Sequence, residues 1–195
     1  MSPATLWVLL AMKKMKKIRN KVIDYINDVI RPPREEFGNM PVCPFAGPEL
    51  DSNKLMIDAV CPGGKTLPEL IRQFLDSEYN SALFAIISDQ QLSSRETVYY
   101  QKFVLNVLEM EGTKDFRVVC FNPNDVDTVV DDFNPRALAP YFLVNIANKH
   151  ELWAAHEVLQ KTQYFHKLSE SYLKYLGVDS KKLNKDECSS SNMGT

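Results

Sequence analysis

The first periodic segment of the chain has the spacing of an α-helix. Between Ile18 and Ile30, apolar residues recur at intervals of three and four positions, which places them on one helical face. Pro32 and Pro33 follow at once, and proline cannot continue the helical hydrogen bonding. The pattern therefore predicts an N-terminal helix that ends near Ile30, followed by an ordered loop over residues 34–53.

Four short apolar runs further along have the character of buried β-strands. They cover residues 55–60, 82–87, 116–121 and 141–146. The first three are almost continuously apolar, which is typical of parallel strands covered on both faces by crossover helices. The pattern predicts an α/β fold, with a single-layer, four-stranded, mixed or mostly parallel sheet, helices packed on it, and further helices at both ends of the chain. The edge that the last strand joins is left open.

The helices that follow these strands begin at capping boxes, in which a first polar side chain and a glutamate three residues later satisfy each other's backbone N–H groups. Such pairs stand at Thr66 and Glu69, at Ser93 and Glu96, and at Asn148 and Glu151. A last helix is expected over residues 164–176. The predicted order is therefore strand and helix in alternation, with two right-handed crossovers.

Length and composition limit the number of domains that the chain can form. Its 195 residues, 45% of them apolar, suffice for one core, which we expect over residues 16–177. The apolar run 6–11 is too short to span a bilayer and precedes its basic cluster, so it is a poor signal peptide. Because Met12 and Met15 follow this run, residues 1–15 are interpreted as a frayed extension, or as lying upstream of the natural start. Residues 178–195 are polar and predict a disordered tail.

Charge and cysteine usage narrow the class of protein. A net charge of -2 gives no general positive field for nucleic acid, so neither nucleic acid nor a membrane is an expected partner. The cysteines are widely spaced, without a pair at metal-ligand spacing, and no cofactor is expected. They are Cys43, Cys61, Cys120 and Cys188. Because a chain of this length does not need disulfides, reduced thiols and a cytoplasmic location are expected.

The loops after the first three strands would meet at one edge of a parallel sheet, where ligands of α/β proteins gather. In the first loop, Lys65 and Thr66 follow two glycines in the sequence and precede a predicted helix. The backbone N–H groups at the N-terminus of a helix favour the binding of anions. Ala59 stands where a phosphate loop needs glycine, so nucleoside triphosphate binding is not predicted. The alternative is a simple turn followed by a helix cap.

The long connection after the third strand offers two kinds of chemistry. Arg136 could clamp a carboxylate or phosphate through two parallel hydrogen bonds, or it could be an ordinary surface arginine. Asp125 and Asp127 carry the hard oxygen ligands of magnesium or calcium, or are simply solvated. Connections of this length are often functional.

Cys43 lies in the loop before the first strand and could be a nucleophilic or redox thiol if a cation lowered its pKa. Ala46 stands where a dithiol oxidoreductase has its second cysteine, so a packed structural cysteine is the alternative. The three histidines fall in the C-terminal helices, away from the predicted edge, and give no indication of a hydrolase triad.

Three short motifs carry a family resemblance. They are Cys43-Pro44-Phe45-Ala46, Phe121-Asn122-Pro123, and Asn134 and Arg136 followed by Pro140 and Tyr141. In this order they resemble an uncharacterised bacterial α/β family, a domain of unknown function, which has a C-P-F-A loop, an F-H-P strand end and an N-R-S-P-Y motif. The resemblance implies the same fold over residues 18–159. Asn122 replaces the family's histidine and leaves hydrogen bonding in place of acid–base or metal chemistry.

These observations favour a small-anion site between the Cys43 loop and the loop 122–141, in a binding protein or an enzyme. The expected ligand-binding residues are Arg136, Asn122, Asn134, Tyr141, Lys65 and Thr66, with Cys43 as the candidate catalytic residue. The competing hypothesis is a non-catalytic interaction protein, and a homodimer, that uses the aromatic residues of its C-terminal helices. Core packing is the alternative role of those residues, which are Trp153, Tyr164, Phe165, Tyr172 and Tyr175.

Overall fold

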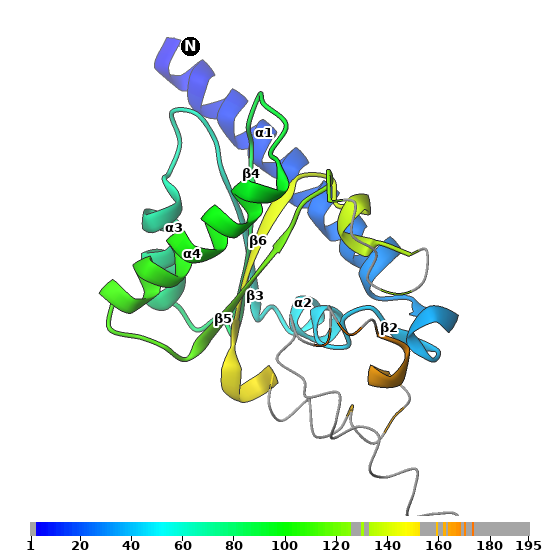
Figure 1. Cartoon of the computed structure of the whole chain (residues 1–195). Coiled ribbons are helices and arrows are strands. Elements are labelled where there is room, and N and C mark those ends of the chain that lie inside the picture. Colours follow the sequence, from blue (N-terminus) through cyan, green and yellow to red (C-terminus); the bar gives the residue numbers. More distant parts are fainter. Residues whose placement is uncertain are drawn as a thin grey trace, which may run out of the picture.

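The computed structural model describes residues 3–125, 130, 133–152, 159, 162, 164–168, 170 and 173 (Figure 1). Its helices and strands occur in the order α1 (Pro3–Tyr25), η1 (Ile26–Ile30), β1 (Pro33–Arg34), η2 (Glu35–Phe37), β2 (Met40–Pro41), α2 (Ala46–Asp51), β3 (Leu55–Val60), α3 (Leu67–Leu75), β4 (Ser81–Ile86), α4 (Ser94–Met110), β5 (Phe116–Phe121), η3 (Pro135–Leu138), β6 (Phe142–Asn148) and η4 (Phe165–Lys167).

A four-stranded sheet with the order β3-β4-β6-β5 forms the centre of the fold. β3 and β4 are parallel, whereas β6 is antiparallel to both of its neighbours, so β3, β4 and β5 run in the same direction. The predicted α/β class with a mixed sheet is confirmed. The last strand lies inside the sheet and not at either edge. Its residues Phe142, Leu143 and Val144 are all buried, as two covered faces require, while β5 carries Arg117 and forms the edge.

Helices cover both faces of this sheet, α3 and α4 on one side and α1 on the other (Figure 1). Alternate residues of each strand point to opposite faces. On β4, for example, Phe84 packs with the core under α3 and α4, whereas Leu83 and Ala85 pack with α1 and η1. The sheet therefore separates two apolar cores.

The helix starts follow the sequence closely. The capping boxes at Thr66 and Ser93 are both formed, and α4 ends just before Gly112, which adopts a φ of +78° that favours glycine. The N-terminal helix ends at Ile30 as predicted, with the π-helix η1 over Ile26–Ile30 as its last part, but it begins earlier than the periodic segment, at Pro3. Periodicity could not indicate this start, because the run 6–11 is apolar without a period.

The structure corrects the predictions for the loop before the sheet and for the last helix. The predicted loop over residues 34–53 contains the antiparallel pair of β1 and β2 and the short helix α2. The predicted helix over residues 164–176 is interrupted, because the chain forms the 3-10 helix η4 and becomes extended at Leu168, whereas Glu170 and Leu173 are helical. Most of residues 169–176, and the predicted tail 178–195, lie outside the described part of the chain.

None of the helices in the described part of the chain combines the length and the apolar character that crossing a bilayer requires.

Candidate functional site

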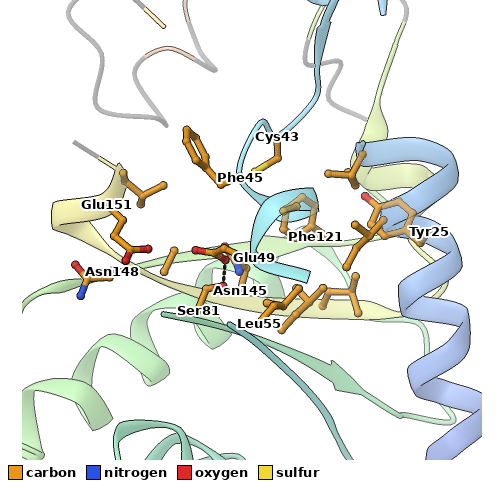
Figure 2. Close-up of a pocket in the computed structure, with 17 residues that line it drawn as sticks. Tyr25, Cys43, Phe45, Glu49, Leu55, Ser81, Phe121, Asn145, Asn148 and Glu151 are labelled. Carbon is orange, nitrogen blue, oxygen red and sulfur yellow. Dashed lines mark hydrogen bonds between the residues drawn. The ribbon is translucent and has the colours of Figure 1, made fainter. Parts of the chain in front are cut away.

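A cavity of about 80 Å³ lies on the α1 side of the sheet, between the sheet and α2 (Figure 2). Its floor consists of residues that alternate along the strands, Ser81 and Leu83 on β4 and Asn145 and Ala147 on β6. Tyr25, Ile26 and Ile30 close it from the N-terminal helix. We call this space the first cavity.

Two glutamates face each other at one end of the first cavity. Glu49 comes from α2, and Glu151 comes from the helical turn that follows β6; Figure 2 shows their carboxylates directed toward one another. Ser81, the first residue of β4, donates its hydroxyl hydrogen to Oε2 of Glu49. Asn145 and Asn148 lie beside this group, and the Asn145 Nδ2 donates to the carbonyl of Ala82.

The pKa of Glu49 is raised from 4.5 to about 7, mainly by burial. The Ser81 hydrogen bond acts to lower it, while the negative charge of Glu151 and the contact between the two carboxyl groups contribute to the rise. Near neutral pH, Glu49 therefore divides between the acid and the carboxylate. A carboxyl group that titrates there, inside a cavity, has the property expected of a functional site.

Local sequence explains why α2 presents Glu49 to the sheet. Gly47 is buried against Arg31, and a Cβ at this position would lie 3.2 Å from the Nε of that arginine. Arg31 in turn donates two hydrogen bonds to the carboxylate of Asp51 at the end of α2. The close approach at Gly47 and the ion pair of Asp51 join α2 to Arg31, the residue that follows η1.

Cys43 lies in the wall of the first cavity, just before α2. Burial raises the pKa of its thiol above the ordinary value of 9.0, although the N–H groups of Phe45 and Ala46 act to lower it. A thiol, not a thiolate, is therefore favoured at neutral pH. The proposed catalytic role of Cys43 stays a prediction.

A second cavity of about 120 Å³ adjoins the first and shares Cys43 and Phe45 with it. Its other walls come from Val119 on β5 and from the described C-terminal residues Leu159, Tyr164 and Phe165. Hydrocarbon and aromatic groups form most of its lining, together with the polar side chains of Arg117 and Asn145.

The loops after β3, β4 and β5 meet at the carboxyl edge of the sheet, because these three strands run in the same direction. A hollow of about 290 Å³ there is lined by Asn122 and Tyr141 together with the β4–α4 loop. Lys21 of α1 lies 5.8 Å from the centre of the Tyr141 ring. The structure thus brings Asn122 and Tyr141 to one hollow and places Cys43 in another.

Asn122 is fully buried and serves to join segments of the chain. Its Nδ2 donates to the carbonyls of Leu92 and Ser93 and to Oγ1 of Thr97, and its Oδ1 accepts the backbone N–H of Asn124. Both ends of the amide are used inside the protein. This holds the end of β5 against the start of α4.

Arg136 forms an ion pair with Asp125, at 3.1 Å between Nη1 and Oδ2, and only 12% and 10% of the two side chains are exposed. The Asn134 side chain caps η3 by accepting the N–H groups of Arg136 and Ala137, and it donates to the Asp125 carbonyl. The positive charge proposed to hold an anion is thus offset by Asp125. Anion binding by this group stays a prediction.

Lys65 and Thr66 are also engaged within the protein. The Lys65 ammonium donates to Gln73, while the backbone N–H and the hydroxyl of Thr66 both donate to the Glu69 carboxylate. The turn and helix cap account for these contacts. Among the described residues there is no cluster of three or more histidine, cysteine or acidic side chains placed to hold a metal, and Asp127 of the metal hypothesis lies outside them.

The C-terminal aromatic residues that the structure describes lie in the core. Tyr164 and Phe165 are 5% and 2% exposed, and the Tyr164 hydroxyl donates to the carbonyl of Val42. Core packing explains these two residues. Trp153, Tyr172 and Tyr175 lie outside the described residues, so the interaction surface and the homodimer stay predictions.

Sequence reasoning missed the two glutamates as a site. The sequence pattern predicts that Glu151 caps a helix together with Asn148. In the structure, the Oδ1 of Asn148 accepts a hydrogen bond from the backbone N–H of His150. A usable signal is present at Asn145, which is a polar position within the otherwise apolar run 141–146. Such residues often mark a place where polar groups converge.

Comparison of the chain with protein-family models, with curated proteins and with solved structures finds no significant match. The resemblance carried by the Cys43 motif therefore stays a prediction, and function has to be argued from the site itself.

Proposed function

We propose that this protein binds a small organic cation in the first cavity, with its ammonium group held between Glu49 and Glu151. The observation that carries this proposal is the arrangement of charge. Two carboxyl groups converge at one end of an apolar cavity, and none of its described lining residues is basic. A carboxylate removed from water needs a charged or hydrogen-bonding partner. Among the described residues, the partly buried Glu49 carboxyl group has the Ser81 hydroxyl and the Glu151 carboxyl group as partners, and neither carries a positive charge.

In the absence of a ligand, a proton on Glu49 relieves the repulsion between the two carboxyl groups. An ammonium group replaces that proton, because its N–H groups can donate to both carboxylates at once. The Glu49 proton then passes to solvent, and no other bond changes. Binding should therefore strengthen as pH rises toward 7, by up to about tenfold for each pH unit well below the pKa of Glu49.

This site differs in charge from the small-anion site that the sequence favours. A negative cavity repels a carboxylate or phosphate, so the anion hypothesis belongs to the carboxyl edge and not to the first cavity. The same Glu49 could exchange a proton with a bound substrate, since general acid–base residues work best with pKa values near the working pH. Cation binding is the step that any such chemistry would need first.

Isothermal titration calorimetry with butylammonium chloride tests the proposal. Titrations near pH 7 in two buffers of different ionisation enthalpy should report release of about half a proton per site, because Glu49 with a pKa of about 7 is half protonated there. Glu49→Gln should abolish the proton release, and both Glu49→Gln and Glu151→Gln should weaken binding. Glu78→Gln, which changes an exposed glutamate, is the matched control.

Two results would overturn this function. One is the absence of binding at millimolar butylammonium; the other is binding that Glu49→Gln and Glu151→Gln leave unchanged. Thermal stabilisation by calcium or magnesium but not by butylammonium would identify a metal site and would also reject the organic cation.

A further inference from the structure

The two cavities on the α1 side of the sheet differ in chemistry but share a wall. Their linings have in common Ile30, Cys43, Phe45, Phe121, Asn145, Ala147 and Leu152. Glu49, Ser81 and Glu151 line the first cavity but not the second, whereas Leu159, Tyr164 and Phe165 line the second but not the first. A line from Glu49 past Cys43 to Phe165 therefore leads from a charged end to an apolar end.

We propose that the two cavities together bind one elongated amphiphile, an alkylammonium ion whose hydrocarbon chain passes Cys43 and Phe45 and ends in the second cavity. This inference rests on the proposed function, which supplies the site for the head group. It adds the class of ligand, because a short cation would fill the first cavity alone.

The walls of the second cavity support a hydrocarbon occupant. Val119 and Leu159 offer only carbon atoms, and the hydroxyl of Tyr164 is already donated to the Val42 carbonyl. Apolar pockets with few polar groups gain affinity from buried hydrocarbon area.

Charge fixes the orientation of the amphiphile. Glu49 and Glu151 attract an ammonium group to the first cavity, whereas the described lining of the second cavity includes no acidic side chain. A ligand with the opposite polarity, such as an alkyl sulfate, would place its charge beside the carboxylates and should bind poorly.

The test is a series of straight-chain alkylammonium ions, from ethyl to decyl, titrated into the full chain below their micelle concentrations. Each methylene that enters the second cavity should tighten binding about fourfold, from ~0.8 kcal/mol per buried CH₂, until the cavity is full and affinity levels off. Val119→Phe fills part of the second cavity and should remove the gain from the longer chains while leaving ethylammonium affinity unchanged. Val98→Phe makes the same change on the exposed face of α4, where Val98 is 50% exposed, and should keep the gain.

A second measurement needs no variant. Cys43 belongs to both linings, so octylammonium should slow its modification by a maleimide more than ethylammonium does at equal occupancy. Peptide mapping separates Cys43 from the other cysteines. Equal protection by the two ions would overturn the path past Cys43.

The outcomes separate this inference from the function on which it rests. If ethylammonium binds with Glu49-dependent proton release but longer chains bind no more tightly, the cation site stands and the amphiphile is rejected. If alkyl sulfates bind as tightly as the alkylammonium ions and show the same dependence on length, the head-group assignment fails while the apolar path remains. A length dependence that Val119→Phe leaves intact would place the chain elsewhere and would also overturn the inference.

Discussion

The raised pKa of Glu49 predicts that the protein loses stability as the pH rises, whereas most acidic residues make a folded protein more stable as the pH rises. The pKa of Glu49 rises from the ordinary 4.5 in the unfolded chain to about 7 in the folded protein. Between these two pH values the folded state binds more protons than the unfolded state, so stability falls as pH rises. The stabilising effect of the proton is fully present below about pH 4.5 and is lost once the pH passes about 7.

The magnitude follows from the two pKa values. A rise from 4.5 to about 7, at about 1.36 kcal/mol for each pH unit, corresponds to at most about 3.4 kcal/mol. Glu49 is only partly buried, and solvent screens its charge, so we expect about 1–2 kcal/mol. Glu49→Gln keeps the shape of the protonated acid and cannot ionise, so it should match the wild type near pH 4, below the unfolded pKa, and exceed its stability by this amount near pH 8.

Urea unfolding followed by circular dichroism at the two pH values measures the difference. Glu96→Gln is the contrasting variant, because hydrogen bonds from Ser93 at the start of α4 lower the pKa of Glu96. Glu96→Gln should be less stable than the wild type near pH 8. The difference in stability between the two proteins should shrink as the pH falls below 4.5. If Glu49→Gln is less stable than the wild type near pH 8, or if the gap between them does not change with pH, the account of Glu49 is wrong.

Three further predictions concern the sequence-predicted residues. Cys43 should react slowly with iodoacetamide near neutral pH and faster only above about pH 9, since burial raises its pKa above 9.0; rapid neutral labelling of Cys43, distinguished from Cys61 by peptide mapping, would contradict this. Arg136→Leu should cost about 3 kcal/mol in urea unfolding, because it leaves Asp125 charged and buried, and adding Asp125→Asn should recover part of the loss; additive losses would argue against a coupled pair. Asn122→Ala should lower the free energy of unfolding by about 2–3 kcal/mol, since it leaves the hydrogen-bond partners of a buried amide unsatisfied. Asn122→His should not restore the full stability, and an unchanged urea midpoint for Asn122→Ala would contradict the role of Asn122 in joining β5 to α4.

The sequence by itself determined the elements and where most of them begin. Thr66 and Ser93 cap their helices because a capping box acts within four residues and needs no distant partner. The apolar runs likewise predicted the strand bounds within one or two residues, because strands that are buried in a sheet consist mainly of apolar residues. The common direction of β3, β4 and β5 followed from the helices between them.

The tertiary structure alone decided the sheet order and the site. The insertion of β6 between β4 and β5 brings Asn145 and Glu151 over Ser81, although these residues are distant in the chain. Whether Glu151 caps a helix or faces Glu49 depends on that placement. The raised pKa of Glu49 arises from burial and from a charge on another element, and both are properties of the packed molecule that short-range sequence patterns do not encode.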